Sequence, residues 1–309
     1  MSEFATHVFE GVPQSDEDWN NFLLDCHNSK PGKTPLAFDP WKTADGMTSY
    51  DLLVDIAKNV RPPDGHPLRL LDLACGDGYL IELCLDRMAG NARILGIDMS
   101  VGELTAARRR LGGRDIALSV ERAQQLSLPD HSVDVVLCHM AFMLMAPVEP
   151  VVSEIARVLR PGGVFAAVIG SSTGLIDGMR TKPYAFHPTL AAEAQTEMRR
   201  FWAEEFPNMS VYSYGDPRVM TVSGLEQLFS TERGFSGSVD VYDFDVLTGT
   251  SAEALWSLFG DTYLASRLDP ERKARLRARL DRLFMEREGA GRSLNVEFTL
   301  RRFSVRTQN

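Results

Sequence analysis

Residues 71–78 read LDLACGDG, and residues 94–100 read ILGIDMS. The first stretch is an apolar run that breaks into two glycines around an acid, and the second is an apolar run that ends in Asp98. A glycine turn between a strand and a helix lets a ligand approach the backbone amides of the helix without meeting a Cβ atom. Asp98 follows Gly78 by 20 residues, the spacing at which a strand-end carboxylate accepts hydrogen bonds from ribose hydroxyls. The two stretches together predict a site for a nucleoside-containing ligand.

Outward from these stretches, apolar runs that predict strands alternate with amphipathic runs that predict helices. The expected strands are 68–75, 92–99, 116–123, 133–144 and 164–170, and the expected helices are 49–60, 78–89, 101–112 and 149–159. Continuous apolar strands that alternate with helices indicate a parallel sheet covered on both faces. Past residue 170 the pattern changes. Alternating stretches at 238–249 and 294–306 predict two further strands, with the last one antiparallel to its neighbour.

The residues around the glycine turn help to choose the nucleoside. A dinucleotide-binding turn follows the pattern G-x-G-x-x-G, but the third glycine position is Ile81 here. Asp77 lies inside the turn and Asp72 precedes it, so a pyrophosphate would be repelled and a cationic ligand favoured. S-adenosylmethionine carries an ammonium and a sulfonium beside its adenosine. It therefore fits the pattern better than a nicotinamide dinucleotide, which is the second choice.

Four blocks of the sequence resemble the class I S-adenosylmethionine-dependent methyltransferases. They are LDLACGDG, GIDMS, LPDHSVDVVLCHMAF and RVLRPGGVF, and they occur in the family's order and spacing within about residues 48–170. The resemblance implies a doubly wound, mostly parallel seven-stranded sheet with an antiparallel last strand and helical insertions after strands 5 and 6. It also implies a methyltransferase activity (EC 2.1.1 type) with S-adenosylmethionine as the cofactor.

The resemblance implies cofactor-binding roles for residues of the first two blocks. Gly76 and Gly78, with Asp72 and Ala74 in the same segment, would hold the methionine part of the cofactor. Asp98 would bind the ribose. A strand-end acid that only caps a helix is the alternative for Asp98.

Further cofactor contacts are expected from other segments. Met99, Ala123 and Gln124 would lie against the adenine, although this chain has Arg122 where many relatives place an acid before the alanine. Tyr50 would contact the cofactor carboxylate, or else it is a packing tyrosine.

His139 is the candidate for both a cofactor contact and a catalytic role. It lies where the fourth strand of relatives delivers side chains toward the reacting methyl group, so it would contact the acceptor or act as a base. A hydrogen-bonded histidine at a strand end is the alternative. A base is needed only for an acceptor such as an ammonium or a phenol, whereas a thioether needs none.

The acceptor should be chosen by segments that vary on this fold. We expect an N-terminal arm or lid at 1–48, a methyltransferase-like domain at 49–309, and a substrate-cap insertion at 171–222. The insertion supplies Tyr212 and Tyr214 as catalytic candidates and His187 and Arg218 as substrate-binding candidates. Each of these side chains is alternatively structural or solvated.

Composition limits the class of partner. The chain of 309 residues has a net charge of −9, which argues against binding nucleic acid phosphates or anionic lipid. No apolar run is long enough to span a bilayer and no signal peptide is visible, so a cytoplasmic protein is expected. The cysteines form no zinc-like cluster, and no metal is expected. A monomer or a homodimer is expected.

The leading hypothesis is a methyltransferase of specialised metabolism that acts on a small molecule, such as an amino-acid-like compound with a nitrogen or sulfur acceptor. One alternative is an enzyme that cyclises or cleaves S-adenosylmethionine and releases methylthioadenosine. The other is a non-catalytic subunit that binds the nucleoside. The nucleoside product separates the first two classes.

Overall fold

The computed structural model describes residues 13, 15–62, 65–88, 90–170, 190–207, 215–248, 251–253, 256, 265, 268–294 and 296–309. Its strands are β1 (Leu68–Leu73), β2 (Ala92–Asp98), β3 (Ala117–Val120), β4 (Val133–His139), β5 (Leu159–Gly170), β6 (Phe235–Thr248) and β7 (Val296–Thr307). Its α-helices are α2 (Asp16–Ser29), α3 (Lys33–Phe38), α4 (Ser49–Asn59), α5 (Tyr79–Arg87), α6 (Val101–Leu111), α7 (Val148–Val158), α8 (Leu190–Glu205), α9 (Val222–Leu228) and α11 (Pro270–Gly289). Short 3₁₀ helices are η1 (Phe142–Leu144), η2 (Pro217–Met220) and η3 (Thr231–Arg233).

The strands form one seven-stranded sheet in the order β3-β2-β1-β4-β5-β7-β6. The first five strands pair in parallel, whereas β7 lies antiparallel between β5 and β6. This is the expected doubly wound, mostly parallel sheet with an antiparallel last strand. Strand order reverses at β1, and in open sheets of this kind ligands bind beyond the carboxyl ends of the strands at such a switch point.

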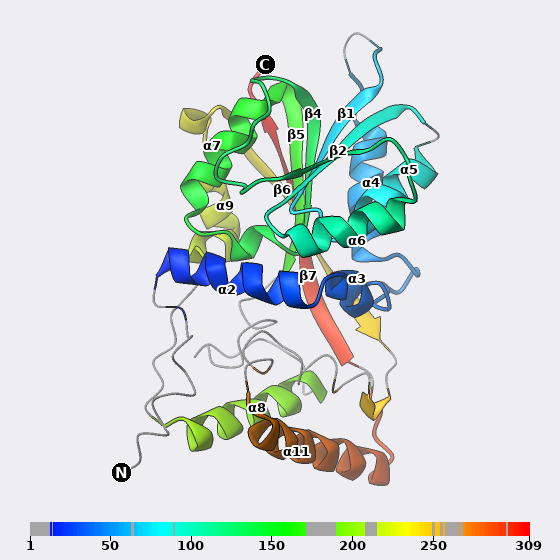
Figure 1. Cartoon of the computed structure of the whole chain (residues 1–309), viewed down its shortest axis with the longest axis vertical. Coiled ribbons are helices and arrows are strands. Elements are labelled where there is room, and N and C mark those ends of the chain that lie inside the picture. Colours follow the sequence, from blue (N-terminus) through cyan, green and yellow to red (C-terminus); the bar gives the residue numbers. More distant parts are fainter. Residues whose placement is uncertain are drawn as a thin grey trace.

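Helices cover both faces of the sheet (Figure 1). Apolar side chains of α4, α5 and α6 pack in one core with β1, whereas those of α7 and α9 pack in a second core on the other face. The helix α7 illustrates how a helix covers one face of the sheet. Its buried residues recur at helical spacing and form one apolar stripe, namely Val148, Val151, Val152, Ile155 and Val158. Burial of each such side chain contributes about 1.5–3 kcal/mol. The helices α8 and α11 pack together beyond the lower end of β7 in Figure 1.

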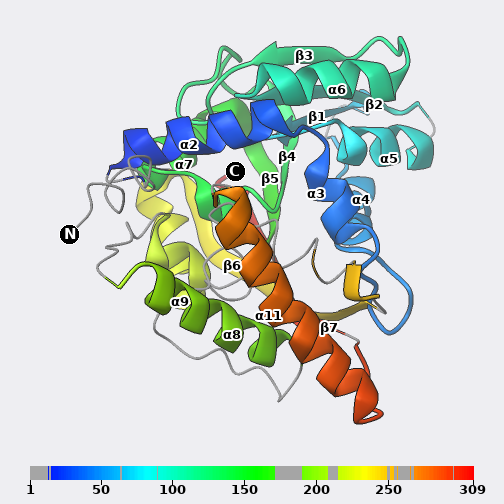
Figure 2. The same cartoon turned by 60° about the horizontal axis from the view of Figure 1, so that its bottom comes forward.

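The helix α2 lies across the sheet rather than on either face (Figures 1 and 2). The indole nitrogen of Trp19 donates to the Leu144 carbonyl at 2.7 Å, which fixes one end of the helix. At the other end, Asn28 accepts hydrogen bonds from the Ser100 hydroxyl and the Gly102 amide. A Cβ at position 102 would lie 2.9 Å from Asn28 Cα, so glycine permits this close approach to α6.

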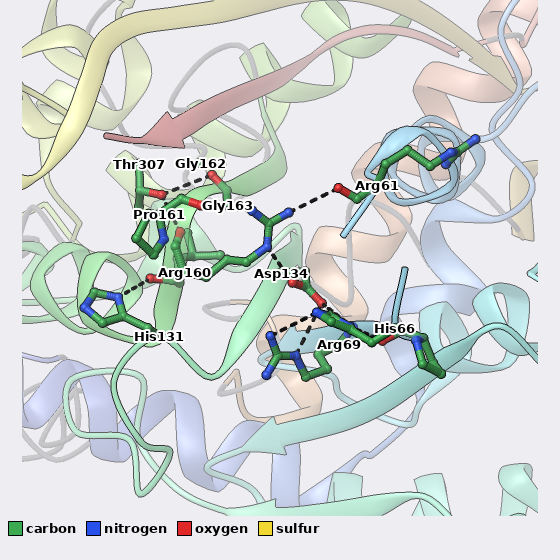
Figure 3. Close-up of polar contacts among 12 residues, drawn as sticks. Arg61, His66, Arg69, His131, Asp134, Arg160, Pro161, Gly162, Gly163 and Thr307 are labelled. Carbon is green, nitrogen blue, oxygen red and sulfur yellow. Dashed lines mark hydrogen bonds and ion pairs between the residues drawn. The ribbon is translucent and has the colours of Figure 1, made fainter. Parts of the chain in front are cut away.

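A buried ion cluster joins β1, β4 and β5 at the end of the sheet opposite to the carboxyl ends of these strands (Figure 3). Asp134 of β4 is fully buried, and its carboxylate accepts from the Arg69 amide at 2.7 Å and from Arg160 Nε. Thr307 of β7 donates to the Arg160 carbonyl at 2.7 Å. Because parallel strands begin at the same edge, this cluster ties together β1, β4 and β5 at the end far from their carboxyl termini.

Three strands differ most clearly from the sequence expectation, among them β5, which begins at Leu159 rather than at residue 164. The run 133–144 was expected to be one strand, but β4 ends at His139 and η1 follows. Met140 adopts a left-handed φ of 53°, which turns the chain there. The expected strand 116–123 is shortened to β3, because this edge strand is mostly exposed and its apolar run is short.

Among the described residues, no helix combines the length and apolar character that crossing a membrane requires.

Candidate functional site

A cavity opens at the carboxyl ends of β1, β2 and β4. It encloses about 1010 Å³ when its open mouth is included. The glycine turn and the acids Asp72 and Asp98 line it, as do His139 of β4 and side chains of α2. The cavity therefore lies at the switch point of the sheet, where the sequence predicts the nucleoside.

The glycine turn connects β1 with α5. Gly76 and Gly78 have φ angles of 52° and 78°, in the region that favours glycine. A Cβ at Gly78 would lie 3.2 Å from Ala107 Cβ of α6, so the turn also lets α5 and α6 pack closely. Ala74 has a φ of 58° and lines the same cavity.

Asp98 is held in a fixed orientation at the end of β2. Its Oδ2 accepts from the Gly76 amide at 2.9 Å and its Oδ1 accepts from the Ser100 amide at 2.8 Å. Burial raises the pKa of this carboxyl, and the hydrogen bonds from Ser100 and Gly76 oppose the rise. Each carboxylate oxygen retains acceptor capacity for a ligand hydroxyl.

Asp72 is buried without a hydrogen-bond partner among the described residues. It is 2% exposed, and its Oδ2 receives no hydrogen bond from the described residues. Burial, followed by the charges of Asp98 and Asp77, raises the pKa of Asp72 to about 8. A buried carboxyl of this kind is stabilised by a cationic group at hydrogen-bonding distance. The site therefore fits a ligand that carries both ribose hydroxyls and a positive charge.

The charge of Asp77 is matched from within the protein. Arg110 of α6 forms an ion pair with Asp77 Oδ2, and it also contacts Glu82 at 3.1 Å. The sequence argument treated Asp77 as a free acid in the turn, and the ion pair corrects that point. The preference for a cationic ligand therefore depends on Asp72 rather than on Asp77.

His139 is a neutral imidazole in the wall of the cavity. Its Nε2 makes a hydrogen bond of 2.8 Å with the Ser49 hydroxyl, and its Nδ1 has no partner among the described residues. Burial lowers the pKa of His139 to about 3. The Tyr50 ring stacks on the imidazole with 3.6 Å between ring centroids, and Phe38 contacts it edge-on. An imidazole with so low a pKa is a weak base, so this environment suits a contact role better than proton abstraction.

The structure brings together most of the expected cofactor residues. Tyr50, Met99, Ala123 and Gln124 all line the cavity with the glycine turn. Arg122 also lines it, and its guanidinium contacts Asn21 Oδ1 of α2 at 3.4 Å.

Of the acceptor residues expected in the 171–222 insertion, only Arg218 belongs to the part of the chain that the structure describes. Arg218 does not line the cavity, and Asp216 and Glu149 already form ion pairs with its guanidinium. This arrangement corrects the expectation of Arg218 as a free clamp for an acceptor carboxylate. His187, Tyr212 and Tyr214 lie outside the described residues.

The sequence analysis missed the cavity residues that come from the N-terminal helices. Asn20, Leu23 and His27 of α2 line the cavity, as does Glu103 of α6. Glu103 is 2% exposed, and its carboxylate accepts from the Gly32 amide at 2.8 Å and contacts His27 Nδ1 at 2.9 Å. An acid at position 103 is typical of the first turn of a helix that begins after Ser100. This local role gives no indication of the contacts that Glu103 makes with residues more than seventy positions earlier.

The described residues offer no obvious metal site. None of their His, Cys, Asp and Glu side chains gather in a group of three that could hold a metal ion.

The sheet order, the glycine turn and the acid at the end of β2 define a class I, Rossmann-like methyltransferase domain. Residues 71–167 match the family described as a methyltransferase domain. Its members use S-adenosylmethionine as the methyl donor.

Curated relatives with this domain carry different names. Demethylmenaquinone methyltransferase of Symbiobacterium thermophilum is 36% identical over 115 residues, which are 36% of this chain and 44% of the relative. Malonyl-(acyl-carrier protein) O-methyltransferase of Methylococcus capsulatus is 36% identical over 144 residues, which are 46% of this chain and 50% of the relative. The chain thus spans half or less of the length of these relatives.

Solved structures share the fold at lower identity. The YcgJ protein of Bacillus subtilis superposes with a TM-score of 0.52 and 15% identity, covering 84% of this chain and 98% of that protein. A protein of Bacillus halodurans C-125 gives a TM-score of 0.52 and 17% identity, covering 84% of this chain and 99% of that protein. At this identity the likeness concerns the fold.

Proposed function

We propose that this protein is an enzyme that transfers a methyl group from S-adenosylmethionine to a small-molecule acceptor. The proposal is carried by the buried carboxyl of Asp72 beside the glycine turn, which has no partner at Oδ2 in the described part of the chain, together with the fixed carboxylate of Asp98. A nucleoside with a cationic amino-acid tail meets both requirements, whereas a dinucleotide meets only the second.

In this proposal each part of the cavity holds one part of the cofactor. Asp98 binds the ribose hydroxyls, and Asp72 with Ala74 and Gly76 holds the methionine part. Gly78 does not line the cavity, and its left-handed φ of 78° shapes the turn. Tyr50 lies near this end through its stacking on His139. When bound, the cofactor supplies an electrophilic methyl group, and the protein positions the acceptor and excludes water.

The N-terminal segment would serve as the lid of this site. Side chains of α2 line the cavity, and the helix is held by Trp19 at one end and Asn28 at the other. Glu103 would hold the following turn by its contacts with Gly32 and His27. A lid fixed at several points supports the exclusion of water from the reacting groups.

His139 would contact the acceptor as a neutral side chain. Its Nδ1 has no partner among the described residues, and its low pKa keeps it uncharged at physiological pH. Tyr212, Tyr214 and His187 remain proposed acceptor contacts from the 171–222 insertion. Arg218 is left out of the proposed site because Asp216 and Glu149 occupy its guanidinium.

The relatives are named for demethylmenaquinone, malonyl-(acyl-carrier protein) and trans-aconitate, so they do not select one acceptor for this chain. We keep an amino-acid-like compound with a nitrogen or sulfur acceptor as the proposed substrate. The proposal further places the protein in the cytoplasm, in specialised metabolism, as a monomer or homodimer without nucleic acid or membrane partners.

The test is a product analysis with isotope-labelled cofactor. The protein is incubated with S-adenosylmethionine carrying a trideuterated methyl group and with fractions of a metabolite extract, and products are identified by mass spectrometry. We expect S-adenosylhomocysteine together with an equal amount of a product that contains three deuterium atoms. Methylthioadenosine without a labelled acceptor would contradict the proposal and favour cyclisation or cleavage. Binding without turnover on every fraction would favour a non-catalytic subunit.

A further inference from the structure

We propose that Ser49 of α4 is a positioning residue that fixes the tautomer of His139, so that Nδ1 of this histidine carries the ring hydrogen and donates it to the acceptor. This role rests on the proposed function, because it assumes that His139 contacts the acceptor. The acceptor would then present an oxygen lone pair to His139, as a carboxylate or a carbonyl group does, rather than an ammonium group.

Ser49 and His139 are far apart in the sequence but adjacent in the fold. Ser49 is the first residue of α4, and His139 is the last residue of β4. Oγ of Ser49 and Nε2 of His139 are 2.8 Å apart, and the two residues are 1% and 7% exposed. Among the described residues, neither side chain makes any other hydrogen bond.

The number of buried polar groups left unpaired decides which partner donates. Burial lowers the pKa of His139 to about 3, so the ring is neutral and carries one hydrogen. If the Ser49 hydroxyl donates to Nε2, that hydrogen lies on Nδ1 and is the single donor left unpaired. If Nε2 donates instead, both the hydroxyl hydrogen and the bare Nδ1 lack a partner. Because an unpaired buried polar group is destabilising, the first arrangement is favoured.

The contacts of the imidazole leave Nδ1 for a ligand. Ser49 occupies Nε2, and the Tyr50 ring stacks on one face with 3.6 Å between ring centroids. Nδ1 is buried and has no partner in the described part of the chain, although His139 lines the cavity. The polar group that His139 can offer to a ligand is therefore Nδ1–H. A lone pair satisfies this donor, whereas an ammonium group carries only hydrogens and would leave it unpaired.

The register of β4 places this donor beside the reactive part of the proposed cofactor. Leu137 of β4 is the register partner of Asp72, and His139 lies two residues further toward the carboxyl end. In the proposed binding mode Asp72 holds the cofactor ammonium and Asp98 holds the ribose, and the sulfonium lies between these two groups of the ligand. An acceptor held at Nδ1 would therefore lie close to the methyl group.

Nitrogen-15 NMR of the imidazole rings measures the tautomer directly. The full chain, labelled at histidine, is recorded at pH 7 without a ligand, and the signals that disappear in His139→Asn belong to His139. We expect Nδ1 at the chemical shift of a protonated ring nitrogen and Nε2 at that of a bare one. The opposite assignment in the wild-type protein would overturn the proposed tautomer.

Variants at the start of α4 test whether Ser49 holds the tautomer. In Ser49→Ala the hydrogen should be shared between the two ring nitrogens, so their shifts should approach each other, whereas Ser49→Thr keeps a hydroxyl and should retain the wild-type shifts. Thr48→Ala is the matched control, because it removes a neighbouring hydroxyl that accepts from the Asp51 amide at 3.1 Å. It should leave both shifts unchanged. Wild-type shifts in Ser49→Ala, with its fold confirmed by circular dichroism, would refute the role of Ser49.

Two small probes test the chemistry of the acceptor. Sodium acetate or methylammonium chloride is added to the complex with S-adenosylhomocysteine, with sodium chloride as the baseline, and the signal of the Nδ1 hydrogen is followed. We expect acetate to shift this signal and methylammonium to leave it in place. A shift with methylammonium, or with neither probe, would overturn the acceptor contact.

These spectra separate the role of Ser49 from the proposed function, because they require no turnover. If the tautomer or the probe response is contradicted while S-adenosylhomocysteine and a labelled product still form, the proposed function stands without this role. If the protein does not bind S-adenosylhomocysteine, the proposed function itself fails, and the spectrum of the ligand-free protein still decides the tautomer.

Discussion

Replacement of Asp72 by asparagine should stabilise the ligand-free protein and weaken cofactor binding. The substitution keeps the shape of a side chain that is 2% exposed, and it removes a carboxyl that has no partner among the described residues at Oδ2. The same carboxyl is proposed to pair with the cofactor ammonium. Stability and affinity should therefore change in opposite directions.

The size of the stability effect follows from the pKa of this group. Burial, with the charges of Asp98 and Asp77, raises the pKa of Asp72 from 3.8 to about 8. The folded protein then binds more protons than the unfolded chain between these two pH values, so the free energy of unfolding falls as the pH rises through this window. At about 1.4 kcal/mol for each pH unit, a window of roughly four units gives an upper bound of about 6 kcal/mol above pH 8.

The assay is urea unfolding of the ligand-free wild-type and variant proteins between pH 5 and pH 9. We expect the two proteins to be closest in stability at the acid end and the variant to be more stable by several kcal/mol at the alkaline end. Asp115→Asn, which changes an exposed acid, serves as the control and should follow the wild-type curve.

Calorimetry in buffers of different ionisation enthalpy measures the affinity for the cofactor and the number of protons released when it binds. At pH 7 a group with a pKa near 8 is about nine-tenths protonated, so pairing with an ammonium should release about 0.9 proton per cofactor. The asparagine variant should release none from this position and bind S-adenosylmethionine at least tenfold more weakly. Equal pH profiles for the two proteins, together with equal affinities, would refute the reasoning for Asp72.

Three further predictions concern other residues. Asp134→Asn should destabilise the protein by about 3–5 kcal/mol at neutral pH in urea unfolding, because it leaves Arg160 without its buried partner; an unchanged midpoint would contradict this. Burial opposes the ionisation of Asp134, but its hydrogen bonds, of which the one from the Arg69 amide is the largest, lower its pKa. The stabilisation that ionised Asp134 provides should therefore be lost as the pH falls through this lowered pKa. Glu103→Gln should weaken the contact with His27 and speed proteolysis within α2, whereas equal cleavage rates would contradict the role of Glu103 in holding the lid. Because burial lowers the pKa of His139 to about 3, kcat should show no titration of this residue between pH 5 and pH 8, and His139→Asn should keep the wild-type pH profile.

Much of the fold and of the cofactor site could be predicted from local patterns. The alternation of strands and helices specified the parallel sheet, since burial on both faces requires continuous apolar strands. The glycines at 76 and 78 specified the turn, and the acid at 98 marked the end of β2. The limits of β4 were less predictable, because the apolar run continues past His139 into η1 and only the backbone turn at Met140 ends the strand.

The sequence by itself determined the class of fold and the glycine turn with its distant acid, because these depend on periodicity and on spacing within one strand-helix-strand unit. Only the tertiary structure decided which charges are matched. Arg110 neutralises Asp77 from 33 positions away, whereas no residue that the structure describes pairs with Oδ2 of Asp72. The structure likewise brought Asn20 to Ala146 across 126 positions. Such partners are set by how whole elements pack, and no local pattern encodes a contact between side chains that are far apart in the chain.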